Sequence, residues 1–260
     1  MVFTIAVAGK GGSGKTSVTS LVIRHLGNKH SGSVLAIDAD PNANLGESLG
    51  LTVERTVGTM LASFNTDKLH IPAGMTKEAW LEFKLNELMV ESKGFDLLSM
   101  GRGEGDGCYC YPNSVLRKYI DIMEDNYAYV VMDNEAGMEH LSRKTTQNVD
   151  ELLLVSNHSV KGVRTLARII ELVAELKLSV KRQAVIISMA PEGKLDPLVV
   201  EELKRLKIEP FAVVPYDGAI VEYDLSARPL LELPDSSKAV MAVDEFMDRV
   251  LMESKAVKSA

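Results

Sequence analysis

The chain has 260 residues, of which 46% are hydrophobic, and a formal net charge of −7 at pH 7. This apolar content is enough for a sizeable core and excludes an intrinsically disordered chain. The acidic balance argues against broad binding to nucleic acid or to an anionic membrane surface. With only two cysteines, the chain has no disulfide framework, and we expect a cytoplasmic protein.

Short apolar runs alternate with helical patterns along the whole chain. The first run, 2–8, lacks a basic region before it, so we expect a strand there and no signal peptide. All the apolar runs are far shorter than the roughly 20 residues that span a bilayer. The predicted strands are 2–8, 33–39, 95–101, 127–133, 151–157, 183–189 and 210–216, and the predicted helices are 15–27, 77–92, 159–177, 197–207 and 236–253.

This alternation predicts an α/β fold. Runs that are apolar almost throughout are typical of strands buried on both faces of a parallel sheet. We expect a doubly wound, mostly parallel sheet of seven or eight strands flanked by helices, with right-handed crossovers. The sequence shows no linker, repeat or low-complexity block, so residues 1–260 are predicted to form a single domain. The last helix carries acidic as well as basic residues, which favours packing onto the domain over membrane docking.

The first predicted strand runs directly into GKGGSGKT, residues 9–16, and a helical pattern follows. This satisfies G-x-x-x-x-G-K-[ST] in the strand–loop–helix context that gives the pattern its meaning. Its glycines allow backbone N–H groups to turn toward phosphate oxygens at a helix N-terminus. Lys15 supplies a charge for the β- and γ-phosphates, and the Thr16 hydroxyl can ligate Mg²⁺. The predicted nucleotide-binding residues of the loop are Gly11, Gly12, Ser13, Gly14, Lys15, Thr16 and Ser17.

Acidic residues end two other predicted strands. Asp38 and Asp40 stand at alternate positions, hence on one side of their strand, at the edge where α/β sheets place ligands. Asp133 ends the strand 127–133, a position suited to an acid that supports Mg²⁺ directly or through water. Gly137 can approach the γ-phosphate through its N–H, and Glu135 is a further candidate. Simple chemistry of the following Pro-Asn turn is the competing explanation for Asp40.

Both cysteines, Cys108 and Cys110, lie in GEGDGCYCYPNSVLRKY. A pair so close can hardly form a disulfide without strain, but both sulfurs can bind one ion. A helix is predicted from 112 onward, and thiols just ahead of a helix N-terminus are favoured as thiolates, which bind metals. Two thiolates make half of a tetrahedral site, which a symmetric dimer would complete. Incidental loop cysteines are the alternative.

The loop KGGSGKT, with its early second lysine, resembles the deviant Walker A loop of the MinD/ParA/nitrogenase-iron-protein class of ATPases. The resemblance implies an ATP-dependent homodimer in which Lys10 reaches across to the partner's nucleotide. It also implies that Asp40 positions the attacking water, that Asp38 helps to hold the magnesium shell, and that the region of Pro215 and Asp217 packs against the base. The catalytic residues predicted in this way are Lys10, Lys15 and Asp40.

The base is assigned to adenine by default. Many members of the class have an asparagine for adenine where this chain has Ser188, Met189 and Ala190. The chain also has no N-K-x-D-like motif of the kind that recognises guanine. ATP with Mg²⁺ is therefore the predicted nucleotide.

Four segments, KGGSGKT, DADPNANL, MGRGEGDGCYCYPN and DNEAGMEHLSR, together resemble the CooC-type accessory ATPases of carbon monoxide dehydrogenase maturation. The resemblance implies Ni²⁺, or Zn²⁺ in its place, at Cys108 and Cys110. It further implies nickel insertion into carbon monoxide dehydrogenase or acetyl-CoA synthase as the client. The histidines show no spacing that joins them to the thiols, and we interpret all five as surface or capping residues: His25, His30, His70, His140 and His158.

Two other functions stay open. An iron–sulfur carrier or reductase resembling the nitrogenase iron protein would bridge subunits through cysteines widely separated in sequence, whereas this pair is adjacent. A partitioning or division-site ATPase of the ParA/MinD type would be expected to show a basic surface for DNA or a basic terminal helix for lipid. The acidic composition disfavours both of those partners, so we predict no nucleic acid and no membrane.

Overall fold

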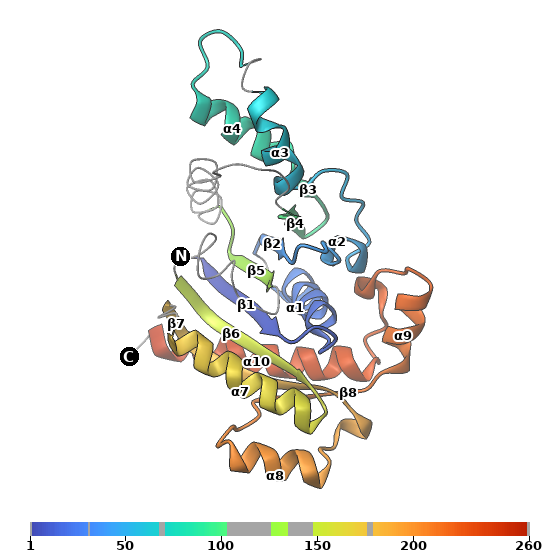
Figure 1. Cartoon of the computed structure of the whole chain (residues 1–260). Coiled ribbons are helices and arrows are strands. Elements are labelled where there is room, and N and C mark those ends of the chain that lie inside the picture. The colour runs from blue at the N-terminus through green and yellow to red at the C-terminus, as the bar shows by residue number, and fades with distance from the viewer. Residues whose placement is uncertain are drawn as a thin grey trace.

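The computed structural model describes residues 2–30, 32–67, 71–102, 126–134, 148–175 and 179–258. Its strands form one eight-stranded sheet in the order β3-β4-β2-β5-β1-β6-β7-β8 (Figure 1). All neighbouring pairs are parallel except β3 and β4, which are antiparallel. The strands are β1 (Phe3–Gly9), β2 (Val34–Ala39), β3 (Val90–Glu91), β4 (Phe95–Ser99), β5 (Tyr129–Asn134), β6 (Asn148–Asn157), β7 (Ser179–Ala190) and β8 (Ala212–Pro215).

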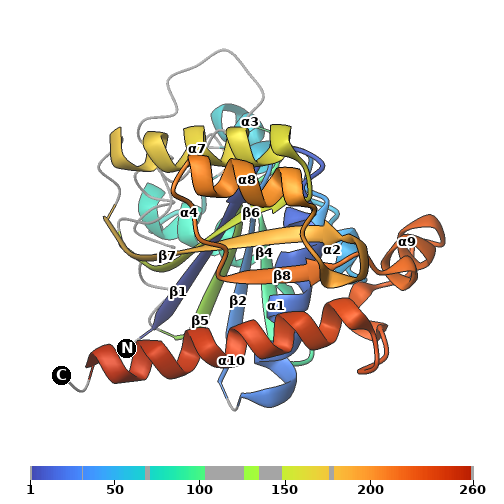
Figure 2. The ribbon, with the colours of Figure 1, turned by 90° about the horizontal axis from the view of Figure 1, so that it is seen from below.

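Helices cover both faces of this sheet, so the predicted doubly wound α/β fold is confirmed, together with all seven predicted strands. Figure 2 shows α7 and α8 on one face, with α10 running along the other. No helix in the described part of the chain combines the length and the apolar composition needed to cross a membrane. The helices are α1 (Lys15–Lys29), α2 (Leu45–Ser48), α3 (Val57–Asp67), α4 (Lys77–Asn86), α7 (Val160–Glu175), α8 (Pro197–Arg205), α9 (Gly218–Leu225) and α10 (Lys238–Lys258).

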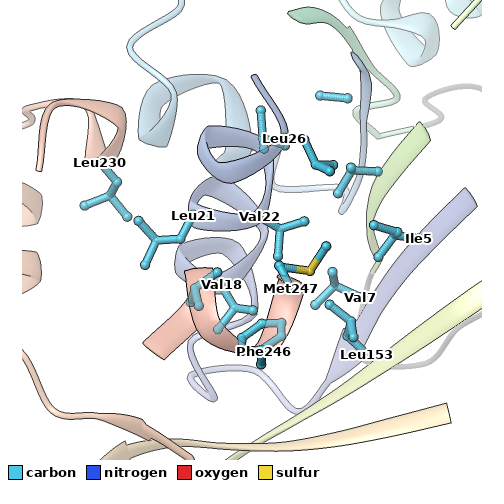
Figure 3. Packing of buried hydrophobic residues seen from close by; sticks show 14 of the residues in the cluster. Ile5, Val7, Val18, Leu21, Val22, Leu26, Leu153, Leu230, Phe246 and Met247 are labelled. Atoms are coloured by element: carbon cyan, nitrogen blue, oxygen red, sulfur yellow. The ribbon is translucent and has the colours of Figure 1, made fainter. Parts of the chain in front are cut away.

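The two faces of β1 contribute to two separate apolar cores. Consecutive strand residues point to opposite faces, so Ala6 packs with the core under α7 and α8, while Ile5 and Val7 pack with the core under α1 and α10. In Figure 3, Val18 and Val22 of α1 lie next to Phe246 and Met247 of α10, with Val7 of β1 beside them. Burying a side chain of this size contributes about 1.5–3 kcal/mol. These contacts hold α1, and with it the loop before it, against the sheet.

The helix predicted over 77–92 is confirmed over 77–86 and wrong over 87–92. The helix α4 begins after Thr76, whose hydroxyl accepts a hydrogen bond from the third residue on, and it ends at Asn86. Val90–Glu91 instead form β3, which pairs with β4 through a tight turn. The turn needs Gly94, whose φ of 91° favours glycine. The helical periodicity of 77–92 therefore led us to overlook Gly94, which marks the turn of the β3–β4 hairpin. The sequence analysis also did not predict α3 or α9.

The parallel strands bring their carboxyl ends to one edge. The chain leaves β1 toward β2 on one side, and after β5 it continues to β6 on the other side of β1. The order of the strands thus reverses at β1, which is where α/β sheets bind ligands outside the strand ends. The loop after β1, the end of β2 and the end of β5 all lie at this edge.

Candidate functional site

The loop between β1 and α1 has the backbone of a phosphate-binding nest. Gly12 and Gly14 have φ of 74° and 80°, conformations that a side chain would strain. The N–H of Ser13 donates to the carbonyl of Lys10 at 3.1 Å and closes the turn. A Cβ added at Gly11 or Gly12 would meet no atom within 4 Å, so open space lies beside this part of the loop. Successive N–H groups in such a loop bind anionic oxygens.

Two neighbouring strands hold this loop in place. Gly9 lies so close to β6 that an added Cβ would stand 2.1 Å from the carbonyl oxygen of Val155. The Ser188 hydroxyl, at the end of β7, is 2.6 Å from the carbonyl oxygen of Ser13 and 3.2 Å from that of Ser156. Ser188 is buried, so this contact is shielded from water. The sequence offered only the position of Ser188 after an apolar strand, with no sign of this contact.

The two lysines of the loop are placed differently. Lys15 is 7% exposed, and its Nζ lies 3.5 Å from the carbonyl oxygen of Lys10. It is therefore held at the loop, as expected for a side chain that reads a bound phosphate. The Lys10 side chain is exposed. An exposed lysine beside the nest is available to a second molecule, which is what a role across a dimer requires.

Asp133 lies beside the first turn of α1. The Thr16 hydroxyl donates to Asp133 Oδ2 at 2.7 Å, and the Thr19 hydroxyl is 3.2 Å from Oδ1. Asp133 is 1% exposed. Burial raises its pKa to about 6, although the Thr16 hydrogen bond and the charge of Lys15 oppose the shift.

Asp38 stands directly beside Asp133, because the two residues are register partners on β2 and β5. Its carboxylate accepts hydrogen bonds from the N–H of Leu45 at 2.9 Å and of Asp40 at 3.2 Å. Burial raises the pKa of Asp38 to about 7 against these hydrogen bonds, and the charge of Asp133 adds to the shift. Two adjacent buried carboxylates repel each other when both are ionised, so a cation bound beside them would stabilise this edge.

The oxygen atoms at this edge suit Mg²⁺. Thr16 Oγ1 and Asp133 Oδ2 are 2.7 Å apart, close to the edge of about 3 Å in an octahedron with bonds of about 2.1 Å. Magnesium prefers hard oxygen ligands and is usually held by one or two protein oxygens, substrate phosphates and water. Thr16 could bind the ion directly, and Asp133 could bind it directly or through water. Asp38 is placed to support that shell.

Asp40 begins the loop after β2. Its Oδ1 accepts hydrogen bonds from the N–H of Asn42 at 2.9 Å and from Asn42 Nδ2 at 3.0 Å. The turn chemistry considered above is therefore present, and these bonds leave Oδ2 for another partner. Asn42 Oδ1 in turn accepts a hydrogen bond from Arg102 at 3.2 Å. Asp40 thus belongs to a short polar chain that ends on the segment leading to the cysteines.

A comparison with known families identifies the family of this chain. A family profile described as the CbiA, CobQ/CobB/MinD/ParA nucleotide binding domain matches residues 4–230. The chain belongs to this family. It is a family of nucleotide-binding ATPases, and the matched residues include the loop between β1 and α1.

Two individual proteins are similar to this chain over nearly its whole length. An uncharacterized ATP-binding protein of Methanocaldococcus jannaschii is 42% identical over 95% of this chain and 98% of its own. The carbon monoxide dehydrogenase accessory protein CooC of Rhodospirillum rubrum is 33% identical over 95% of this chain and 97% of its own.

Solved structures of MinD/ParA proteins have the same fold. A ParA family ATPase of Chlorobium tepidum superposes with a TM-score of 0.72 at 18% identity, covering 94% of this chain and 97% of that one. MinD of Pyrococcus horikoshii, complexed with Mg-ADP, superposes with a TM-score of 0.68 at 20% identity and covers 96% of both chains. At these identities the likeness concerns the fold alone.

A cavity of about 290 Å³ opens beside the phosphate loop of this family member. Thr16 and Ser17 line it, whereas Gly11, Gly12, Ser13, Gly14 and Lys15 are not among its lining residues. Pro215 and Asp217 lie elsewhere at the same edge, outside the described lining. Asp217 accepts hydrogen bonds from Ser237 Oγ at 2.6 Å and from the first turns of α9 and α10, so it caps both helices. The other lining residues are Asn44, Glu47, Ser48, Ile220, Asp224, Ala227, Arg228 and Leu230.

The predictions for the cysteine segment lie outside the described residues. Cys108 and Cys110 fall in 103–125, and Glu135 and Gly137 fall in 135–147. The thiol site, the approach of Gly137 to the γ-phosphate and the candidate acid Glu135 therefore stay predictions.

Proposed function

We propose that this chain is a homodimeric ATPase of the CooC type that binds Ni²⁺, or Zn²⁺ in its place, and delivers nickel to carbon monoxide dehydrogenase or acetyl-CoA synthase. Two copies of the Cys108 and Cys110 pair would supply the four thiolates of a tetrahedral site. The protein would act in the cytoplasm, with neither nucleic acid nor membrane as a partner.

One observation carries the proposal. A carbon monoxide dehydrogenase accessory protein is similar to 95% of this chain at 33% identity, and the chain places its only two cysteines one residue apart. A partitioning ATPase has no chemical need for such a pair. The ParA/MinD alternative is compatible with the fold. Metal binding at the cysteine pair distinguishes the two functions, because only the proposed one requires it.

The proposal gives each of the described site residues a role in hydrolysis. The nest and Lys15 bind and orient the triphosphate, while Thr16, Asp133 and Asp38 would hold Mg²⁺, which neutralises the phosphate charge. Asp40 would align the attacking water through its free Oδ2, and Lys10 of the partner would stabilise the charge that develops in the transition state. Two lysines over one triphosphate repel each other unless both face that developing charge.

The polar chain from Asp40 through Asn42 to Arg102 supports a coupling between nucleotide and metal. Arg102 is six residues before Cys108, and its hydrogen bond to Asn42 ties the start of that segment to the loop that senses the γ-phosphate. A ligand shifts an equilibrium only by its difference in affinity for the two states. The proposal therefore requires the metal to prefer one nucleotide state, and the nucleotide to prefer the metal-bound state in return.

The test measures metal and oligomer together. Ni²⁺ and Zn²⁺ are titrated into the protein with and without a non-hydrolysable ATP analogue, while mass is followed by analytical ultracentrifugation. We expect one ion per dimer, bound more tightly in the analogue-bound dimer, and loss of that ion in Cys108→Ser/Cys110→Ser. Lys10→Ala should lose dimerisation and hydrolysis, whereas the control Lys194→Ala, a removal of an exposed lysine elsewhere, should lose neither.

Other outcomes favour the alternatives. If the metal affinity is the same with and without the ATP analogue, and is unchanged by the cysteine substitutions, the delivery function is overturned. A ParA/MinD-type ATPase would then be the remaining function. A brown anaerobic preparation with iron and sulfide bound at the cysteines would favour the iron–sulfur carrier.

A further inference from the structure

A second group of metal-binding side chains lies between α1 and α10, away from the phosphate loop. His25 is completely buried, which corrects its interpretation as a surface residue. It lies ten residues after Lys15 on the same helix, about 15 Å along the axis. His30 directly follows α1, and its ring centroid is 5.3 Å from that of His25. Asp248 on α10 completes the group.

The hydrogen bonds of His25 define which ring nitrogen can bind an ion. Its Nδ1 is 2.8 Å from Asp244 Oδ1, and Lys29 Nζ is 2.9 Å from the other oxygen of the same carboxylate. Since an ionised carboxylate only accepts, Nδ1 must carry the proton. The neutral ring then presents a lone pair at Nε2, and this atom is buried without a hydrogen-bond partner among the described residues. An unpartnered buried nitrogen calls for an explanation.

We propose that His25 Nε2, a ring nitrogen of His30 and the carboxylate of Asp248 bind a divalent first-row cation of the Zn²⁺ class. The three ligand atoms lie within 4.8 Å of one another. His25 Nε2 and Asp248 Oδ1 are 3.5 Å apart, and a tetrahedral ion with bonds of about 2.1 Å places its ligands about 3.4 Å apart. Imidazole and carboxylate are the donors that such ions accept.

The surroundings of the group fit a metal site. Asp244, one helical turn before Asp248 on the same face of α10, orients His25 as carboxylates commonly orient metal-binding histidines. With a neutral His25, the nearby charges are two carboxylates and Lys29, which leaves one negative charge for the cation. Three protein ligands leave a fourth position for water. The ion would clamp α10 to α1 beside the core that the two helices share.

The competing arrangement is a histidinium ion. Protonated on both nitrogens, His25 would bridge Asp244 and Asp248 as an ion pair and would bind no metal. The two arrangements differ in the proton on Nε2, which the metal replaces. Metal binding and the ¹⁵N shifts of the ring distinguish them.

The experiment uses the full chain with Cys108→Ser/Cys110→Ser, so that the proposed thiol site cannot contribute. After chelation, Zn²⁺ is titrated by calorimetry and Co²⁺ by absorption spectroscopy. We expect one ion per chain, a Co²⁺ spectrum without thiolate charge transfer, and a rise in melting temperature with Zn²⁺ concentration. Asp248→Asn and His30→Gln should each weaken Zn²⁺ binding more than about tenfold, and Asp244→Asn about 10- to 100-fold.

Glu245→Gln is the matched control, because it removes one exposed carboxylate from the same helix without touching the group. It should bind Zn²⁺ like its parent. The Asp248 side chain is 47% exposed, so Asp248→Asn is expected to fold. The proposal is overturned if the thiol-free protein binds no Zn²⁺, or if Asp248→Asn and His30→Gln bind it unchanged. Ring shifts of a doubly protonated His25 that persist with Zn²⁺ present would establish the histidinium instead. Since the cysteines are absent throughout, failure of the thiol site leaves this test unaffected.

Discussion

Ser188→Ala tests whether β7 positions the phosphate loop. The substitution removes a buried hydroxyl that lies 2.6 Å from the carbonyl oxygen of Ser13, and it changes the volume of the side chain by a single atom. The loop carbonyl then loses a donor that is shielded from water. The nest glycines stay in place, so any effect on nucleotide comes from the support of the loop.

The structure gives the magnitude. A buried polar group left without its partner costs about 1–3 kcal/mol of stability. The hydrogen bond itself contributes about 0.5–1.5 kcal/mol, and about 1.4 kcal/mol corresponds to a tenfold change in affinity. If the loop must be ordered by the nucleotide in place of Ser188, the Kd for ATP should rise between about two- and tenfold.

Urea unfolding and binding of a fluorescent ATP analogue measure the two effects. Ser156→Ala is the control, because Ser156 is a buried serine on the adjacent strand whose hydroxyl donates to the carbonyl of Asn157 and whose backbone contact with Ser188 survives. The control should lose stability and keep its Kd within about twofold. If Ser188→Ala behaves like the control in both measurements, the hydroxyl is a core group and the loop does not depend on it.

Further substitutions follow from the geometry, with Gly11→Ala as the control for the first. Gly9→Ala should lose about 3 kcal/mol or more in urea unfolding, because its Cβ would collide with the backbone of Val155, whereas Gly11→Ala, in open space, should lose less than about 1 kcal/mol. Burial opposes the shift, but several hydrogen bonds hold the pKa of Asp217 below its ordinary value of 3.8, so its stabilisation is present above that pH and lost below it. Asp217→Asn should therefore cost about 1 kcal/mol at pH 7 and progressively less below pH 3.8 by thermal unfolding, and a cost independent of pH would contradict this. Arg102→Met should leave ATP hydrolysis intact but reduce the effect of the ATP analogue on metal affinity, measured by the titration above.

Local sequence patterns predicted the phosphate loop and all the strands except β3. The phosphate loop is a short continuous segment whose glycines, lysine and hydroxyl act on one ligand, so its conformation can be read without knowledge of distant residues. The acids at the ends of β2 and β5 could be brought to the same edge by the rule for parallel sheets alone. Elements that form only by pairing with another segment were harder to predict from the sequence. The two residues of β3 become a strand only because β4 lies beside them.

Contacts between distant residues account for the rest of the site. Ser188 acts on Ser13 across 175 positions of sequence, and no pattern within β7 announces that contact. The burial of His25 was within reach, because it follows Val18, Leu21 and Val22 at helical spacing on the apolar stripe of α1. We interpreted His25 as a surface residue because histidine is polar, whereas the helical spacing of the apolar residues on α1 places it on the buried face.

The nucleotide edge is built for a ligand and not for stability. Asp38 and Asp133 are buried side by side, and burial raises the pKa of both, which means that folding pays a cost to keep them ionised. Lys15 offsets part of this cost, and a magnesium–triphosphate complex would offset more. Ligands that bind only the folded state stabilise it in proportion to their concentration over Kd. Natural sequences break the rule against buried like charges mainly at functional sites. The pair of carboxylates at the ends of β2 and β5 therefore indicates a cation site at this edge, independently of the loop motif.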